Sequence, residues 1–134
     1  MKRVLILCTG NSARSQMAEG LLRRMAGPRM EVFSAGTAPT SVRPEAIQVM
    51  SELGIDISGH RSKHVDEFAE QHFDCVITVC NHARDVCPVF PDGTERLHWS
   101  FRDPAAVEGD EETRLAAFRQ IRDEIAARMR AELT

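Results

Sequence analysis

The sequence of 134 residues lacks the features that mark several large classes of protein. No apolar run approaches the roughly 20 residues that a membrane-spanning helix needs, and the first apolar run is too short for a secretory signal. The net charge is −3, so the surface has no excess of positive charge to attract nucleic acid or an anionic membrane. We therefore expect a cytoplasmic protein without nucleic-acid or membrane partners.

Aromatic residues and cysteines are also few. The chain has no tyrosine, one tryptophan and four cysteines. In the reducing cytoplasm, such cysteines indicate redox chemistry or metal binding rather than a structural disulfide framework. No repeat, low-complexity tract or linker divides the sequence, and 43% apolar residues are enough for one hydrophobic core. We expect a single domain over residues 1–134, and a monomer.

Short apolar runs alternate with segments of helical spacing along the chain. The runs VLIL and FDCVITV are typical of strands buried in a parallel sheet. The pattern predicts strands near residues 4–7, 31–34, 73–79 and 96–99, and helices near residues 12–26, 44–53 and 111–133. This order predicts a three-layer α/β/α fold, in which helices cover both faces of a four-stranded parallel sheet. Ligands of such sheets bind beyond the carboxyl ends of the strands.

The stretch CTGNSARS at residues 8–15 lies at such a carboxyl end. Cys8 closes the first strand and Arg14 opens the next helix, so the short loop between them presents backbone N–H groups to an anion. The arginine fork can hold two oxygens of a tetrahedral oxyanion. The same positive surroundings favour the thiolate form of Cys8, to which the Ser12 hydroxyl can donate a hydrogen bond. The predicted oxyanion-binding residues are Thr9, Gly10, Asn11, Ser12, Ala13 and Arg14.

Each of these residues also has a simpler interpretation. Cys8 could be a buried strand residue and Arg14 a surface residue of the helix. We favour the catalytic interpretation, because a nucleophile and an oxyanion hole share eight residues between a buried strand and an amphipathic helix. The carboxyl group of Asp103 could protonate a departing oxygen, although Asp103-Pro104 taken alone is only a turn signal.

The other cysteines lie in or after the FDCVITV strand. Cys80 ends that strand at the same sheet edge as Cys8, and Cys87 follows seven positions later. With His82 and a distant histidine these two cysteines could bind zinc, but their irregular spacing disfavours such a site, and we expect no metal. They could also be inert core residues, as we expect of Cys75 inside the strand.

Three stretches of the sequence resemble one known superfamily. LCTGNSARSQMAEG at residues 7–20, SAGT at 34–37 and HWSFRDPA at 98–105 are similar to the low-molecular-weight protein tyrosine phosphatases, and more closely to the thioredoxin-coupled arsenate reductases among them. The resemblance runs in order over essentially the whole chain. It implies a low-molecular-weight phosphatase-like fold. It also implies that Asp103 is the general acid, since superfamily members carry this acid in an Asp-Pro at this point of the chain.

The resemblance to the reductases also assigns the remaining cysteines. Cys8, Cys80 and Cys87 match the three redox cysteines of that family by position. Reduction of arsenate to arsenite needs two electrons, which two thiols supply on forming a disulfide, and a third thiol can move that disulfide outward. The resemblance thus implies an arsenate reductase of arsenic detoxification, recycled by thioredoxin and without a bound cofactor. The predicted catalytic residues are Cys8, Ser12, Arg14, Cys80, Cys87 and Asp103.

A phosphatase is the main alternative, because hydrolysis of a phosphomonoester through a Cys8 phospho-enzyme needs the same loop and acid. The absence of tyrosine leaves few side chains for an aromatic wall against a phosphotyrosine ring, which favours a bare oxyanion. We expect weak phosphatase side activity in a reductase, since phosphate and arsenate share shape and charge. A non-catalytic oxyanion-binding or redox-sensing module is disfavoured, because binding alone needs no general acid.

Some reductases of the superfamily bind potassium beside the loop. The corresponding residues here are Asn11, Glu19, Ser34 and the pair Arg61 and Lys63. A metal cation beside two fixed cations is electrostatically unfavourable. We therefore expect Lys63 or Arg61 to replace the ion and to pair with Glu19, unless Lys63 is a solvated surface residue. Asn11 is expected to brace the loop through backbone hydrogen bonds.

Overall fold

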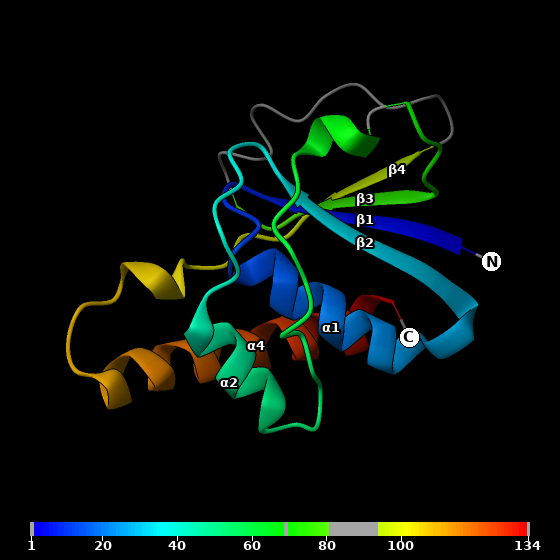
Figure 1. The fold of residues 1–134 in the computed structure, drawn as a ribbon. Coiled ribbons are helices and arrows are strands. Elements are labelled where there is room, and N and C mark those ends of the chain that lie inside the picture. Colours follow the sequence, from blue (N-terminus) through cyan, green and yellow to red (C-terminus); the bar gives the residue numbers. More distant parts are fainter. Residues whose placement is uncertain (1, 69, 81–93, 134) are drawn as a thin grey trace.

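A parallel sheet of four strands forms the centre of the computed structural model, which describes residues 2–68, 70–80 and 94–133 (Figure 1). The strand order is β2-β1-β3-β4. The strands are β1 (Lys2–Cys8), β2 (Met30–Gly36), β3 (Cys75–Thr78) and β4 (Glu95–His98). The predicted parallel sheet is therefore confirmed, with β1 between β2 and β3.

The register of the sheet places the ends of β1 and β2 side by side. Cys8 pairs with Gly36 of β2, and Leu7 pairs with Thr78 of β3. Because all four strands run in the same direction, the segments that follow β1, β2 and β3 leave the sheet at one edge. This edge is the place where parallel α/β sheets bind their ligands.

The three α-helices formed by the described residues lie together against one face of the sheet (Figure 1). They are α1 (Arg14–Ala26), α2 (Pro44–Ser51) and α4 (Glu111–Glu132). Short 3-10 helices cover Gly27–Arg29, Val65–Phe68 and Pro104–Ala106. Among the described residues, the opposite face carries the 3-10 helix Val65–Phe68, where the Phe68 ring lies 5.6 Å from that of Phe33 and 6.0 Å from that of Phe73.

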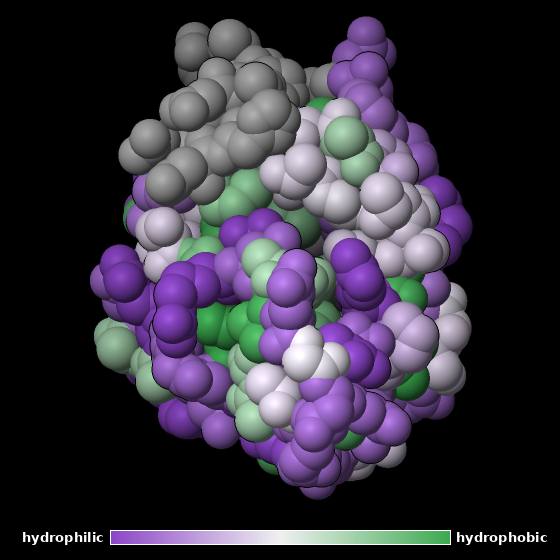
Figure 2. Space-filling model, turned by 90° about the vertical axis from the view of Figure 1, so that its left-hand side faces the viewer, coloured by the Kyte–Doolittle hydropathy of each residue, from purple (hydrophilic) through white to green (hydrophobic). Residues whose placement is uncertain are grey.

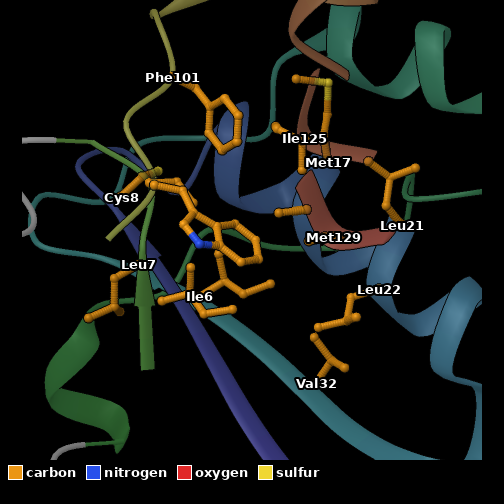
Figure 3. Close-up of a cluster of buried hydrophobic side chains, with 14 of the residues drawn as sticks. Ile6, Leu7, Cys8, Met17, Leu21, Leu22, Val32, Phe101, Ile125 and Met129 are labelled. Atoms are coloured by element: carbon orange, nitrogen blue, oxygen red, sulfur yellow. The ribbon is translucent and has the colours of Figure 1, made fainter. Parts of the chain in front are cut away.

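The main core fills the space between the sheet and the helices. Its side chains include Ile6, Met17, Leu21, Leu22, Val32, Ile125 and Met129, all at most 3% exposed (Figure 3). Each such side chain stabilises the fold by about 1.5–3 kcal/mol through burial of apolar surface. Cys8 lies at the border of this core and is 2% exposed. The core therefore holds the end of β1 in place.

The predicted elements correspond to observed ones, with shifts at their ends. The strand predicted near 31–34 extends over Met30–Gly36, and the one predicted over 73–79 shortens to Cys75–Thr78. The first helix begins at Arg14, as the loop motif predicts, although helical spacing of apolar residues already starts near residue 12. No helix formed by the described residues is long and apolar enough to cross a membrane.

Candidate functional site

The loop after β1 holds a buried thiol beside a hydroxyl group. Cys8 Sγ lies 2.9 Å from Ser15 Oγ, which belongs to the first turn of α1. Ser12, predicted to contact the thiol, is half-buried, and its hydroxyl makes no hydrogen bond with another described residue. The hydroxyl beside Cys8 is therefore that of Ser15, a residue that sequence reasoning missed. The available signal was its position in the first turn of the helix, seven residues after Cys8.

The loop carbonyls are all engaged by other segments of the chain. Backbone N–H groups of residues 37–43 donate to four of them: Thr37 N to Cys8 O at 3.2 Å, Ala38 N to Thr9 O at 2.9 Å, Thr40 N to Gly10 O at 3.0 Å and Arg43 N to Ser12 O at 2.9 Å. The Asn11 carbonyl accepts from Ser62 Oγ at 2.7 Å. In contrast, no backbone N–H of residues 9–13 donates to a described residue. Such a row of unengaged amides can form a nest that accepts an anion.

The N-terminus of α1 adds to this positive surface. Its first turn has no side-chain cap from the described residues and no acidic residue, and Ala13 occupies the N-cap position. The other long helix, α4, begins in the usual way, because Asp110 accepts a hydrogen bond from Thr113 N at 2.8 Å. The first N–H groups of α1 are thus left for a ligand, and the helix dipole favours an anion there.

Asn11 holds the loop in an unusual backbone conformation. Its φ is 49°, in the left-handed region, which costs a residue other than glycine about 1–3 kcal/mol. Its buried amide group donates to Ser15 Oγ at 2.8 Å and Ser34 Oγ at 3.0 Å, and its Oδ1 accepts from Lys63 N at 3.0 Å. These bonds offset the strain. Asn11 therefore braces the loop, as expected, although largely through its side chain.

Arg14 and Asp103 meet at the open side of the loop. Arg14 Nη1 donates to the Phe101 carbonyl at 3.0 Å, and its Nη2 lies 3.9 Å from Asp103 Oδ2. Asp103 Oδ1 accepts from Ala105 N at 2.9 Å, which anchors the carboxylate at the start of the 3-10 helix Pro104–Ala106. The Asp103 side chain is 45% exposed, so it can exchange protons with solvent. The fold thus brings this carboxylate beside the loop from 89 residues away in the sequence.

Two further cysteines lie at opposite ends of β3. Cys80 follows the strand, and its Sγ lies 3.3 Å from Thr9 Oγ1, within hydrogen-bonding distance for sulfur. Cys75 begins the strand at the other edge, where burial, and then the charge of Glu95, raise its thiol pKa to about 11. Cys87 and His82 lie outside the described residues. Cys8 and Cys80 therefore share one sheet edge, and Cys75 is separated from both.

The buried Glu19 carboxylate lies behind the loop. It accepts a hydrogen bond from Ser34 Oγ at 2.6 Å, and it lies 3.2 Å from Arg23 Nη2 and 3.4 Å from His60 Nδ1. The prediction that Lys63 or Arg61 pairs with Glu19 is wrong. Arg23 takes this place because it stands one turn after Glu19 on the same helix.

The two predicted cations are used elsewhere. Arg61 pairs with Glu67 at 2.8 Å, and Lys63 Nζ donates to the Arg61 carbonyl at 3.0 Å. Burial lowers the pKa of Lys63, while the charge of Glu19 acts in the other direction. Burial also lowers the pKa of His60, again against the attraction of Glu19.

The oxygen atoms near Glu19 are not arranged to bind a potassium ion. The ion would need oxygen ligands from Asn11, Ser34 and Glu19, but these oxygens already take part in hydrogen bonds within the protein. Arg23 also neutralises the Glu19 carboxylate. Within residues 2–68, 70–80 and 94–133, no three His, Cys, Asp or Glu side chains form a metal-binding group.

An open pocket of about 630 Å³ lies beside Asp103. It is lined mainly by apolar residues of the segment after Asp103 and of α4, among them Pro104, Val107 and Ile121. Figure 2 shows this side of the molecule, where hydrophobic surface lies at the bottom of hollows framed by hydrophilic side chains. The pocket therefore opens beside Asp103, between the segment 102–107 and α4.

Comparison with solved structures supports the fold. An arsenate reductase in an oxidized state superposes with a TM-score of 0.84 at 32% identity, covering 98% of this chain and 95% of that one. A thioredoxin-dependent arsenate reductase of Corynebacterium glutamicum gives a TM-score of 0.77 at 33% identity, over 98% of this chain and 59% of the other.

Comparison with known sequences gives the same family. An arsenate reductase of Halalkalibacterium halodurans is 48% identical over 129 residues, which are 96% of this chain and 93% of the relative. An arsenate reductase of Bacillus subtilis is 43% identical over the same shares. The family model for low molecular weight phosphotyrosine protein phosphatase matches residues 3–134. The chain therefore belongs to the low molecular weight phosphotyrosine protein phosphatase family.

Proposed function

We propose that this protein is an arsenate reductase. Its Cys8, Cys80 and Cys87 thiols supply the two electrons that reduce arsenate, and thioredoxin then reduces the disulfide that remains. The observation that carries the proposal is the unengaged row of amides around the buried Cys8, with Cys80 at the same edge. The naming of the 43–48% identical relatives as arsenate reductases favours arsenic over phosphorus as the centre attacked.

The first step is attack on bound arsenate. The N–H groups of residues 9–14 and the guanidinium of Arg14 hold the oxyanion, and Ser15 Oγ donates to the Cys8 thiolate. The thiolate forms a sulfur–arsenic bond while one oxygen leaves as water, with its proton supplied by Asp103. Arsenic remains pentavalent in this adduct, so the electrons are transferred in the next step.

The second step transfers two electrons. The Cys80 thiolate attacks Cys8 Sγ, a disulfide forms between them, and the pair of electrons of the sulfur–arsenic bond stays on arsenic, which leaves as arsenite. The contact between Thr9 Oγ1 and Cys80 Sγ at 3.3 Å supports this role, because it holds Cys80 against the loop that begins at Cys8.

The third step moves the disulfide away from the loop. The Cys87 thiolate attacks Cys80 and releases Cys8 as a thiol, leaving a Cys80–Cys87 disulfide for thioredoxin to reduce. Cys87 lies outside the described residues, so its support comes from its place in the sequence. The Corynebacterium relative is a thioredoxin-dependent arsenate reductase, which supports thioredoxin as the reductant.

Hydrolysis of small phosphomonoesters is the second candidate function. The position of Asp103 beside Arg14 favours it, because the same acid can protonate an alcohol leaving group. A low molecular weight protein tyrosine phosphatase of T. tengcongensis also shares the fold, with a TM-score of 0.76 at 29% identity. We expect this activity to be weak.

Coupled assays separate the two functions. Arsenate-dependent oxidation of NADPH, with thioredoxin and thioredoxin reductase, is measured beside hydrolysis of para-nitrophenyl phosphate. We expect Cys80→Ser and Cys87→Ser to lose arsenate turnover and to keep the ester hydrolysis of the wild type. Cys75→Ser is the control and keeps both. Wild-type protein that hydrolyses the ester well and shows no arsenate turnover would overturn the reductase proposal.

A further inference from the structure

At Gly36 the end of β2 passes so close to the loop that no side chain fits between them. It is the last residue of β2 and pairs in register with Cys8. A Cβ atom added there would lie 2.4 Å from the Thr9 carbonyl oxygen and 2.9 Å from Asn11 N. Real Cβ contacts are essentially never under 3.0 Å, and both atoms belong to the backbone, so no flexible side chain can give way.

We propose that Gly36 is a positioning residue for oxyanion binding, an inference that rests on the site described under the proposed function. Its missing side chain allows the segment after β2 to lie against the loop. The next two residues, Thr37 and Ala38, then donate their N–H groups to the carbonyls of Cys8 and Thr9. Gly36 thereby sets which way the loop peptides face.

The physical link runs through a single peptide plane. The Thr9 carbonyl and the Gly10 N–H belong to the same rigid peptide unit, so a carbonyl that is pushed aside carries that N–H with it. Asn11 cannot absorb the displacement, because its side chain is fixed by Ser15, Ser34 and the Lys63 amide. A methyl group at residue 36 therefore turns an amide away from the oxyanion.

The experiment compares Gly36→Ala with Gly59→Ala. Gly59 is exposed, and a Cβ there would meet nothing within 4 Å, so the same change is tolerated. Binding of inorganic phosphate to the reduced proteins is measured by calorimetry, together with KM and kcat for arsenate. We expect Gly36→Ala to weaken phosphate binding and raise the arsenate KM about tenfold, the effect of losing one hydrogen bond to a charged group. Gly59→Ala should stay within about twofold of wild type.

Thermal unfolding in parallel separates positioning from folding. A merely structural role would lower the melting temperature and leave the phosphate affinity of the folded molecules unchanged, which overturns the inference. If Gly36→Ala does not fold, Ala38→Pro is used instead. This change removes the N–H group that donates to the Thr9 carbonyl, and the proline ring has room because the side chain of residue 38 is exposed. It too should weaken phosphate binding about tenfold, and wild-type affinity would overturn the inference.

The two proposals fail separately. Wild-type protein that binds phosphate but does not reduce arsenate overturns the reductase function, and the effect of Gly36→Ala on binding then still supports the role of Gly36. Active wild-type enzyme with an unaffected Gly36→Ala variant overturns the role of Gly36 alone. Wild-type protein that binds neither oxyanion overturns both.

Discussion

The two ends of the sheet place the same residue type in opposite surroundings. At the carboxyl end, Cys8 stands beside Ser15 Oγ, a loop of unengaged amides and an uncapped helix. At the amino end, Cys75 is 1% exposed and faces the Glu95 carboxylate, and burial with this charge raises its pKa to about 11. Both thiols are buried, so burial alone does not separate a reactive cysteine from an inert one.

The direction of the strands accounts for this difference. In a parallel sheet all carboxyl ends meet at one edge, where helices begin and expose their first N–H groups. A thiolate is stabilised there and destabilised beside a carboxylate at the other edge. The position of a cysteine along its strand therefore predicts its chemistry better than its exposure does.

The strongest test removes one thiol from each edge. Cys8→Ser should lower both arsenate turnover and ester hydrolysis by at least about 10⁴-fold, because it removes the nucleophile itself. Cys75→Ser should keep turnover within about twofold in the same coupled assays. Loss of most activity in Cys75→Ser would break the distinction between the edges.

A second test weakens the positive charge of the carboxyl edge without removing it. Arg14→Lys should lower kcat/KM for arsenate about 100-fold, because an ammonium group cannot hold two oxyanion oxygens as the guanidinium fork does. Arg24→Lys is the control on the same helix, where the arginine donates to the Leu53 and Gly54 carbonyls. Equal effects of the two changes would contradict the proposed role of Arg14.

A third test asks which serine assists Cys8. Ser15→Ala should slow alkylation of Cys8 by iodoacetamide at pH 7 and lower kcat about tenfold, since it removes the hydroxyl 2.9 Å from the sulfur. Ser12→Ala is the matched change on the loop and should have a smaller effect on alkylation. The reverse order would restore Ser12 as the residue that donates to the thiolate.

The smallest effect concerns the amino edge and depends on pH. The Cys75 pKa rises from 9.0 to about 11 on folding, so the unfolded chain loses this proton first as the pH increases. The resulting stability is complete below pH 9 and is lost between pH 9 and 11, about 3 kcal/mol in total. Denaturant unfolding at pH 8 and pH 10.5 should therefore show a weaker pH dependence for Cys75→Ala than for wild type. Identical pH dependence would show that the thiol is not shielded.

The order of strands and helices was predictable because it depends on local patterns. Runs such as VLIL and FDCVITV indicate burial directly, and every predicted strand and helix is present. Cys8 and Arg14 were recognisable for the same reason, since the strand and helix on either side of the loop fix their places. The role of Asp103 needed the family resemblance, because an isolated Asp-Pro indicates no more than a turn.

The contacts around the loop were not predictable in the same way. Ser12 and Ser15 carry the same side chain, so the sequence does not tell which hydroxyl lies beside Cys8. The backbone conformation of the loop, with an Asn11 φ of 49°, places the Ser15 hydroxyl beside the sulfur. The charge partner of Glu19 was misassigned because the nearby Arg23 and His60 reach it, whereas Arg61 is drawn to Glu67.

By itself, the sequence determined the order of the elements, the oxyanion loop and the cysteines that could act there, because hydrophobic periodicity and small-residue loops are local properties. The tertiary structure alone decided which hydroxyl touches Cys8, which cation meets Glu19 and why residue 36 has no side chain. Those outcomes depend on the distances between segments such as 8–12 and 36–43. Tertiary packing sets these distances, and the pattern of residues along the chain does not contain them.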